Sequence, residues 1–131
     1  VSNVFLGHIN ERFPRVLDLV VGDPVQVEKL VKEILASLPE EFSLKQNYPN
    51  PFNPVTTIQF GLPQPVNVRL TIVNILGQEV ATLINDWRDI GFHQVRWAGV
   101  NDQGLPVSTG VYFSILTDGH QVQIRKMLLV K

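Results

Sequence analysis

Near the start of the chain, apolar residues recur with the period of an α-helix. Six of them follow at spacings of three and four: Val27, Leu30, Val31, Ile34, Leu35 and Leu38. This pattern places them on one stripe and predicts an amphipathic helix over about residues 24–38. Asp23 is a suitable N-cap, and Pro39 is expected to end the helix. A helix this short is marginal alone, so its stripe is expected to pack on another surface.

From residue 43 onward the pattern changes to short stretches of alternating apolar and polar residues, which is typical of strands. In one of them Val68, Leu70 and Ile72 share a face. Strands are expected over residues 43–48, 56–62, 66–74, 78–84, 91–97, 110–117 and about 120–130. Asp118-Gly119 is the signal of a two-residue hairpin before the last strand. Seven short strands predict a mainly β fold, an antiparallel immunoglobulin-like sandwich preceded by a short arm with one helix.

Charge also divides the chain near residue 42. Residues 1–42 carry four basic and seven acidic side chains, whereas residues 43–131 carry seven and five. We therefore expect an N-terminal arm, or the remnant of a cargo, over residues 1–42 and the sandwich over residues 43–131. Within the arm, Val4–Ile9 and Val16–Val21 predict short extended segments. Such a short arm can hardly build a core of its own, so it must pack on the sandwich or on another chain.

The overall composition excludes several classes of protein. There are no cysteines, which excludes disulfide scaffolds, iron–sulfur clusters and cysteine-based zinc sites. The formal net charge of -1 argues against a nucleic-acid partner, because nucleic-acid binders need a basic patch. No apolar stretch reaches the length of a membrane-spanning helix, about 18 residues. The chain begins with Val1 and shows no signal-peptide pattern, so we expect a processed mature chain or a piece of a longer protein.

No arrangement of residues indicates catalysis, a metal site or a cofactor. His8, His93 and His120 are isolated and never occur at metal-ligand spacing. The chain has no nucleotide-binding loop and no nucleophile-elbow motif. Residues 101–104 (NDQG) lack the ligand pattern of a calcium loop and predict a plain turn. We therefore expect no enzyme activity.

The two tryptophans raise the question of sugar binding, since some β-sandwich modules stack sugars on aromatic rings. Trp97 alternates with core positions and is expected to be buried. Trp87 is expected in a turn between Asp86 and Asp89, whose carboxylates are expected to face solvent rather than form a catalytic pair. Carbohydrate is therefore not an expected partner.

The most unusual string in the sequence is YPNPFNP, residues 48–54. Its prolines fix the backbone in an extended corner that cannot join the centre of a sheet. The asparagines are suited to bonding neighbouring backbone groups, and Phe52 is expected to anchor the core. Physically, this string predicts a rigid corner at the start of a domain, and it implies no chemistry.

Together with this string, several separated motifs resemble a known family, in the same order. They are FSLKQNYPNPFNPVTTIQFGLP, VRLTIVNILGQEVATL, GFHQVRWAGVNDQGLPVSTGVYFSIL and RKMLLVK. From Phe42 to Lys131 the chain resembles the C-terminal sorting domains (type A) of the type IX secretion system, and the related immunoglobulin-like domain of flagellar hook-capping proteins. The resemblance implies a sandwich that is recognised after export to the periplasm and directs passage across the outer membrane. It thus implies the outer-membrane secretion machinery as partner and a place at the cell surface or outside the cell.

The resemblance also assigns residues. The family's opening motif corresponds to Asn50, Pro51, Phe52, Asn53 and Pro54. Its central turn corresponds to Gly77 and Gln78, and its penultimate strand to Gly110, Val111 and Tyr112. Its terminal strand, the part most associated with export, corresponds to Lys126, Met127, Leu128, Leu129, Val130 and Lys131.

Most of these residues are expected to maintain the fold, whereas the edge of the terminal strand is a candidate for pairing with a receptor strand. One departure is visible. The family often has Trp-Asp-Gly where this chain has Trp97, Ala98 and Gly99, so any role of that aspartate is absent here.

Two functions remain open at this point. In the first, residues 43–131 are a non-catalytic sorting and anchoring module, and residues 1–42 are the tail of an exported cargo or its linker. In the second, the chain is the mature subunit of an extracellular filament or surface assembly built on the same sandwich. The helix stripe would then pack on an identical neighbouring subunit.

Overall fold

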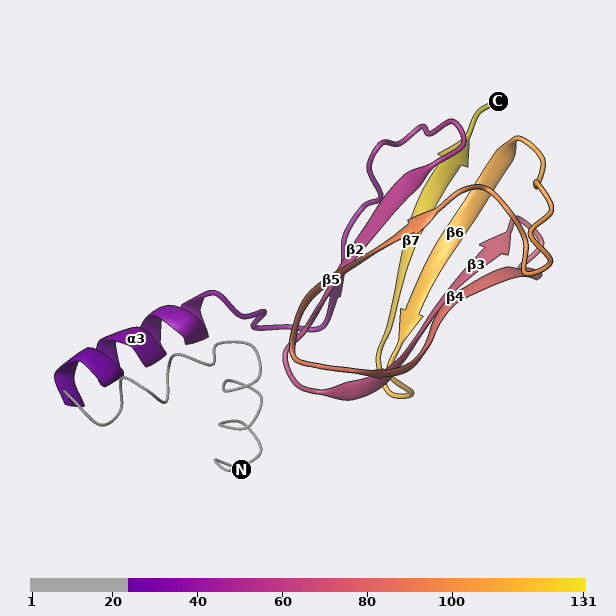
Figure 1. Cartoon of the computed structure of the whole chain (residues 1–131). Coiled ribbons are helices and arrows are strands. Elements are labelled where there is room, and N and C mark those ends of the chain that lie inside the picture. The colour runs from indigo at the N-terminus through magenta and orange to yellow at the C-terminus, as the bar shows by residue number, and fades with distance from the viewer. Residues whose placement is uncertain (1–23) are drawn as a thin grey trace. The chain divides into compact units, whose positions relative to one another are not determined.

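The computed structural model of the chain describes residues 24–131. Contacts divide the chain into two units, Val1–Pro39 and Glu40–Lys131. The described part of the first unit is one helix, and the second unit is a β-sandwich (Figure 1). The extended segments expected at Val4–Ile9 and Val16–Val21, like His8 and the N-cap Asp23, lie outside the described residues.

The helix α3 spans Pro24–Ala36 and ends two residues earlier than the pattern predicts. The N–H of Ser37 turns to the carbonyl oxygen of Ile34 at 3.0 Å, and its hydroxyl donates to the same oxygen at 2.7 Å. Leu38 precedes Pro39, and a residue before proline is disfavoured in helical geometry. The last predicted turn therefore opens before the proline is reached.

The second unit contains seven antiparallel strands in two sheets, which confirms the predicted mainly β sandwich. One sheet has the order β1-β2-β5, formed by Ser43–Leu44, Thr56–Leu62 and Gly91–Trp97. The other has the order β4-β3-β6-β7, formed by Glu79–Arg88, Val66–Asn74, Gly110–Thr117 and Val122–Leu129. In this second sheet β7 is an outer strand, with β6 as its only sheet neighbour.

The core lies between the two sheets, because alternate residues of each strand point inward. On β3 the predicted inward residues Val68, Leu70 and Ile72 are all buried. Trp97 is 2% exposed, and its indole N–H donates to the carbonyl oxygen of Val100 at 2.8 Å. This confirms that Trp97 is a core residue and not a platform for a sugar. Phe42 also belongs to this core, one residue before the expected start of the sandwich.

Three strands differ in length from the prediction, and the last of them, β7, spans Val122–Leu129 instead of about residues 120–130. The strand expected over residues 43–48 is regular only at Ser43–Leu44, because three residues oppose two of β2 before Tyr48 pairs with Thr57. This extra residue forms a bulge. The buried Asn47 side chain stabilises the bulge by donating to the Pro49 carbonyl oxygen and the Thr56 hydroxyl. Strand β4 runs on to Arg88 instead of ending at residue 84.

The extension of β4 corrects the placement of Trp87. Trp87 lies within the strand and pairs with Asn67, so it is not in a turn, although its side chain is 58% exposed. Asp86 is exposed and forms an ion pair with Arg88 at 2.7 Å. The physical reason is that the strand is paired along its whole length with β3, which overrides the local polar signal.

The connection between β6 and β7 is a four-residue loop and not the predicted two-residue hairpin. Thr117 pairs with Val122, and Asp118 bonds across the loop to Gln121. The Asp118 carboxylate accepts from the N–H groups of Gln121 at 2.7 Å and His120 at 2.8 Å. These hydrogen bonds, chiefly that from Gln121, lower the pKa of Asp118 below its ordinary value of 3.8. The Asp118 carboxylate thus stabilises the wider loop through hydrogen bonds to its backbone N–H groups.

Candidate functional site: the opening motif and the terminal strand

The opening motif contributes one side chain to the core and leaves the others in solvent. Phe52 is 2% exposed, and its ring lies 5.7 Å from that of Trp97. Asn50, Pro51, Asn53 and Pro54 are exposed. The bonds that precede its two prolines are cis. The expectation that Phe52 anchors the core agrees with this burial.

The same motif lies against the terminal strand β7. Phe52 bonds to Leu128, which is 76 residues later in the sequence. The N–H of Phe52 donates to the carbonyl oxygen of Leu128 at 2.9 Å, and the N–H of Val130 donates to the carbonyl oxygen of Phe52 at 2.9 Å. The N–H of Leu128 donates to the side-chain oxygen of Asn50 at 3.0 Å. The opening motif therefore caps the outer edge of the end of β7.

A glycine allows this close approach. Gly99 has φ 68, and a Cβ atom there would lie 3.2 Å from the carbonyl oxygen of Pro54 and 3.4 Å from a methyl carbon of Leu129. An alanine at this position would be strained by its backbone and crowded by both segments. Gly99 thus allows the opening motif and the terminal strand to approach each other closely at this point. Ala98, which stands where the family often has aspartate, is exposed.

The middle of the β7 edge is also covered by side chains. The guanidinium of Arg125 donates to the carbonyl oxygen of Leu44 at 2.8 Å, and the Gln123 side chain accepts from the N–H of Leu44 at 3.3 Å. The amide of Gln46 donates to the carbonyl oxygen of Lys126 at 2.7 Å. The edge is therefore largely occupied within this chain. Pairing of this edge with a receptor strand would require these contacts to open first, and it stays a prediction.

The outward face of β7 has the opposite character, because it is apolar and exposed. Its outward residues alternate along the strand: Val122, Ile124, Lys126, Leu128 and Val130. The four aliphatic side chains are 60%, 53%, 37% and 42% exposed in that order. We call these five residues the terminal-strand face. Across β6 the facing side chains of Val111, Phe113 and Ile115 are half-buried and continue the apolar surface.

The other half of the same sheet is mainly polar, apart from the exposed Trp87 and the half-buried Val73. On β3 and β4, Arg69 pairs with Glu79 at 2.7 Å, and the Thr82 hydroxyl also donates to Glu79. The hydrogen bonds from Thr82 and Arg69 lower the pKa of the Glu79 carboxyl from its ordinary value. An outer sheet surface normally carries such polar residues. The terminal-strand face differs from it because its exposed aliphatic side chains follow one another along one strand, and such a contiguous patch needs an explanation.

The remaining family positions lie in a turn, in the core or at the surface of the sandwich. Gly77 has φ 79 in the turn between β3 and β4, and Gln78 bonds to Asn74 across that turn. On β6, Tyr112 is buried, packs its ring edge-on against Trp97, and donates its hydroxyl to the carbonyl oxygen of Ser108 at 2.6 Å. Gly110 begins this strand and pairs with Leu129, and Val111 pairs with Leu128. Met127 and Leu129 of the terminal strand are fully buried, whereas Lys126 and Lys131 are exposed.

The predicted stripe of α3 is partly covered in the single chain. Ile34 is 6% exposed, and only Leu35, at 43%, is an exposed member. The other members, which are half-buried, are Val27, Leu30, Val31 and Leu38. Use of the stripe as an assembly face stays a prediction.

Among residues 24–131, no group of three histidine, aspartate or glutamate side chains could hold a metal ion. Residues 101–104 form a turn in which the side-chain oxygen of Asn101 accepts two backbone N–H groups. His93 bonds to the carbonyl oxygen of Asp89 and stacks on Phe60, and His120 is exposed. None of residues 24–131 belongs to an apolar helix of membrane-spanning length.

Val122 and Ile124 extend the terminal-strand face beyond the residues that the sequence pointed to. Their signal is visible in retrospect, since apolar residues occupy both alternations of the last strand. The outward series runs through Val122 and Ile124 to Val130, and the inward series through Met127 and Leu129. Apolar residues on both alternations are typical of a strand that is covered on both faces.

Comparison with known proteins gives one family. A family model described as the secretion system C-terminal sorting domain matches residues 46–131. A search of the curated proteins found no match.

Solved structures show similar folds. Dimeric latent PorU from Porphyromonas gingivalis matches over 70% of this chain and 10% of its own, with 17% sequence identity and a TM-score of 0.53. PorZ, a surface component of the type-IX secretion system of the same species, matches over 73% of this chain and 12% of its own, with 19% identity and a TM-score of 0.47. FlgD from P. aeruginosa matches over 56% of this chain and 58% of its own, with 16% identity and a TM-score of 0.46. This chain therefore spans about a tenth of the length of PorU and PorZ.

Proposed function

Because the chain belongs to the family of secretion system C-terminal sorting domains, we propose that its sandwich is the label that directs an exported protein across the outer membrane to the cell surface. Domains of this family mark proteins that reach the cell surface or the extracellular space, and the family is in general non-catalytic. The label would extend from about residue 43 to Lys131, with Phe42 in its core. Residues 1–42 would be the linker or the tail of the cargo.

The terminal-strand face carries the proposal. Export is associated in this family with the terminal strand, and here the edge of that strand is occupied by Asn50, Phe52 and Gln46. What β7 leaves for a partner is its outward face, where exposed aliphatic side chains surround Lys126. Contiguous exposed apolar surface is typical of a protein–protein contact. The secretion machinery would thus recognise a folded surface and not an unpaired strand.

The experiment compares two double variants of the full chain fused behind a secreted reporter, in a bacterium that has this secretion system. Ile124→Thr with Leu128→Thr makes the terminal-strand face more polar. Threonine is a good strand former, so both positions keep a residue that suits a strand. We expect the reporter to accumulate in the periplasm, with surface or medium signal reduced about tenfold or more, as for loss of two interface anchors. Cell fractionation measures the distribution.

The chain offers a closely matched control. Ile75 and Leu76 are 74% and 77% exposed in the turn between β3 and β4. Ile75→Thr with Leu76→Thr therefore makes the same chemical change away from β7, and we expect export at the level of the unchanged chain. If both double variants are exported equally well, the terminal-strand face is not the recognition surface. If the unchanged chain is also retained, the sorting function itself is refuted.

A second candidate function draws on the same exposed face. Apolar sheet surface can also pack on an identical subunit, as the filament or surface-assembly hypothesis requires. Light scattering on the purified chain distinguishes the two, since a sorting label is expected at the 14.8 kDa of one chain. Regular polymers in electron micrographs that disappear with Ile124→Thr and Leu128→Thr would favour the assembly.

A further inference from the structure

The outward face of the three-stranded sheet differs in chemistry from the terminal-strand face. Cross-strand pairs on one face of β2 and β5 share a side of the sheet, and here they are Thr57 with Arg96, Gln59 with Gln94, and Gly61 with Phe92. Tyr48 pairs with Thr57 on the other flank, and Lys45 bonds its N–H to the carbonyl oxygen of Gln59. We call this surface the amide face. Its members with side chains are Lys45, Tyr48, Thr57, Gln59, Phe92, Gln94 and Arg96.

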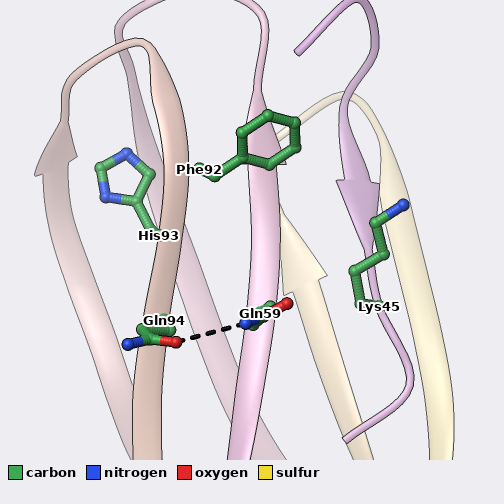
Figure 2. Close-up of a pocket in the computed structure, with 5 residues that line it drawn as sticks. All are labelled: Lys45, Gln59, Phe92, His93 and Gln94. Atoms are coloured by element: carbon green, nitrogen blue, oxygen red, sulfur yellow. Dashed lines mark hydrogen bonds between the residues drawn. The ribbon is translucent and has the colours of Figure 1, made fainter. Parts of the chain in front are cut away.

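Two aromatic rings stand at the ends of the amide face. Tyr48 is 81% exposed and Phe92 is 57% exposed. Phe92 lies opposite Gly61, which has no side chain, so the ring extends over β2, as Figure 2 shows. Thr57 and Gly61, their partners on β2, are four residues apart, which is about 13 Å along a strand. Only an extended ligand could touch both rings.

Between the rings lie two shallow hollows that share their floor. One, of about 210 Å³, is lined by Lys45, Gln59, Phe92, His93 and Gln94. The other, of about 440 Å³, is lined by Gln46, Tyr48, Thr57, Gln59 and Gln94. Gln59 and Gln94 line both, so the two hollows are neighbours on the amide face, one beside Phe92 and the other beside Tyr48. We call the two hollows together the groove.

The floor of the groove has unused hydrogen-bonding capacity. The Gln59 side-chain amide donates to the Gln94 side-chain oxygen at 3.2 Å, drawn as the dashed line in Figure 2. Each amide offers two donors and one oxygen, so this single bond leaves donors on both and the Gln59 oxygen for a ligand. Exposed amides that hold one another in place are suited to hydroxyl groups, which both donate and accept.

The charge of the amide face has one sign. Lys45 and Arg96 are exposed, and within residues 24–131 neither forms an ion pair. No aspartate or glutamate is among the members of the face. A ligand that carries carboxylates would therefore meet only attraction on this surface.

The two tryptophans gave no reason to expect a sugar partner, but the amide face contains neither of them, and we propose that it binds an extended acidic polysaccharide. The rings of Tyr48 and Phe92 would stack on sugar rings, the amides of Gln59 and Gln94 would bond sugar hydroxyls, and Lys45 and Arg96 would attract carboxylates. A protein partner fits less well, since the middle of the face is formed by two exposed amides and a lysine, and lysine is depleted in the core of protein interfaces. The proposal is independent of the sorting function, because it uses the opposite sheet.

The test is affinity gel electrophoresis of the full chain, with polygalacturonate in one gel and uncharged barley β-glucan in another. We expect retardation by polygalacturonate, weakened by salt. Phe92→Ala and Tyr48→Ala should each weaken binding about tenfold without changing the net charge, the usual size for loss of one aromatic contact. Phe92→Tyr and Tyr48→Phe should retain binding, and they keep the test valid if truncation of Phe92 disturbs the fold around Gly61.

The matched control is Trp87→Ala. Trp87 is 58% exposed, nearly the same as Phe92, but lies on the four-stranded sheet, so binding should be unchanged. No retardation of the unchanged chain by polygalacturonate would overturn the proposal. So would equal loss of binding in Trp87→Ala and Phe92→Ala. Equal retardation in both gels would overturn the acidic character of the ligand, and Lys45→Gln would then be without effect.

Discussion

At the scale of single residues, Phe52 joins the two ends of the sandwich sequence. Its ring is buried beside Trp97, and its backbone bonds to Leu128 and Val130 of the terminal strand. Prolines on both sides keep its neighbours out of a regular strand. Phe52 thus links the core to the edge of β7, the core through its ring and the edge through its backbone.

Ser114 is a residue whose chemistry is at odds with its place. It lies inward on β6 and is fully buried, and its hydroxyl has no hydrogen-bond partner among the described residues. Because burying an unpaired hydroxyl costs about 1–3 kcal/mol, we expect Ser114→Ala to raise stability by about 1 kcal/mol. For a domain of this size, the melting temperature should rise by about 4–8 °C. Circular dichroism on heating measures it.

Thr71→Ala is a useful comparison for this prediction. Thr71 is also a buried hydroxyl residue, but it lies on the outward side of the next strand, beside Ile115. Loss of its methyl group should lower the melting temperature. A fall with Ser114→Ala as well would mean that the serine hydroxyl has a partner, such as a bound water.

At the scale of elements, β7 depends on a segment that is remote in sequence. Its inner edge pairs with β6, while Asn50, Phe52 and Gln46 cover much of its outer edge. An uncovered outer strand invites pairing with other chains. The opening motif thus covers an edge that other chains could otherwise pair with, while the outward face of β7 stays exposed.

The cap on β7 can be tested through one hydrogen bond. Asn50→Ala removes the acceptor of the Leu128 N–H, which is worth about 1 kcal/mol. We expect amide hydrogen exchange at Leu128, followed by NMR, to speed up about fivefold. Asn53→Ala is the matched control, because the Asn53 side chain is exposed and bonds no described residue. Equal acceleration in both variants would mean that the corner as a whole, and not Asn50, protects the edge.

Alternation along the chain was enough to predict most elements, and long-range pairing explains the rest. The strands at Thr56–Leu62, Val66–Asn74 and Gly91–Trp97 alternate clearly and have the predicted bounds. The bulge before Tyr48 was not predictable, because it depends on the buried contacts of Asn47. The covered edge of β7 was not predictable either, because it depends on contacts of Gln46, Asn50 and Phe52 with a strand that is remote in sequence.

At the scale of the whole molecule, the sandwich presents two unlike surfaces. One sheet carries the aliphatic terminal-strand face, and the other carries the aromatic and polar amide face. The resemblance to the sorting-domain family pointed to the terminal strand. It gave no indication of the amide face, in which Tyr48 and Phe92 come from segments that are distant in sequence. Only the folded register brings those two rings to one groove.

The sandwich should also be independent of the residues before it. The buried apolar residues of its core all lie between Phe42 and Leu129. We therefore expect a chain that begins at Glu40 to fold alone and to melt within about 3 °C of the full chain, which corresponds to less than about 1 kcal/mol. Calorimetry on both chains measures this difference.

Phe42→Ala provides the positive control for that comparison, since it removes a buried core side chain near the cut. A loss of about 3–5 kcal/mol is expected from it, so the measurement would detect damage to the sandwich. If the chain from Glu40 melts more than about 10 °C lower, residues 1–39 contribute more than 1 kcal/mol to the sandwich. An independent sandwich could follow any cargo, because its recognition surface would form whatever precedes it, and this is what a sorting label requires.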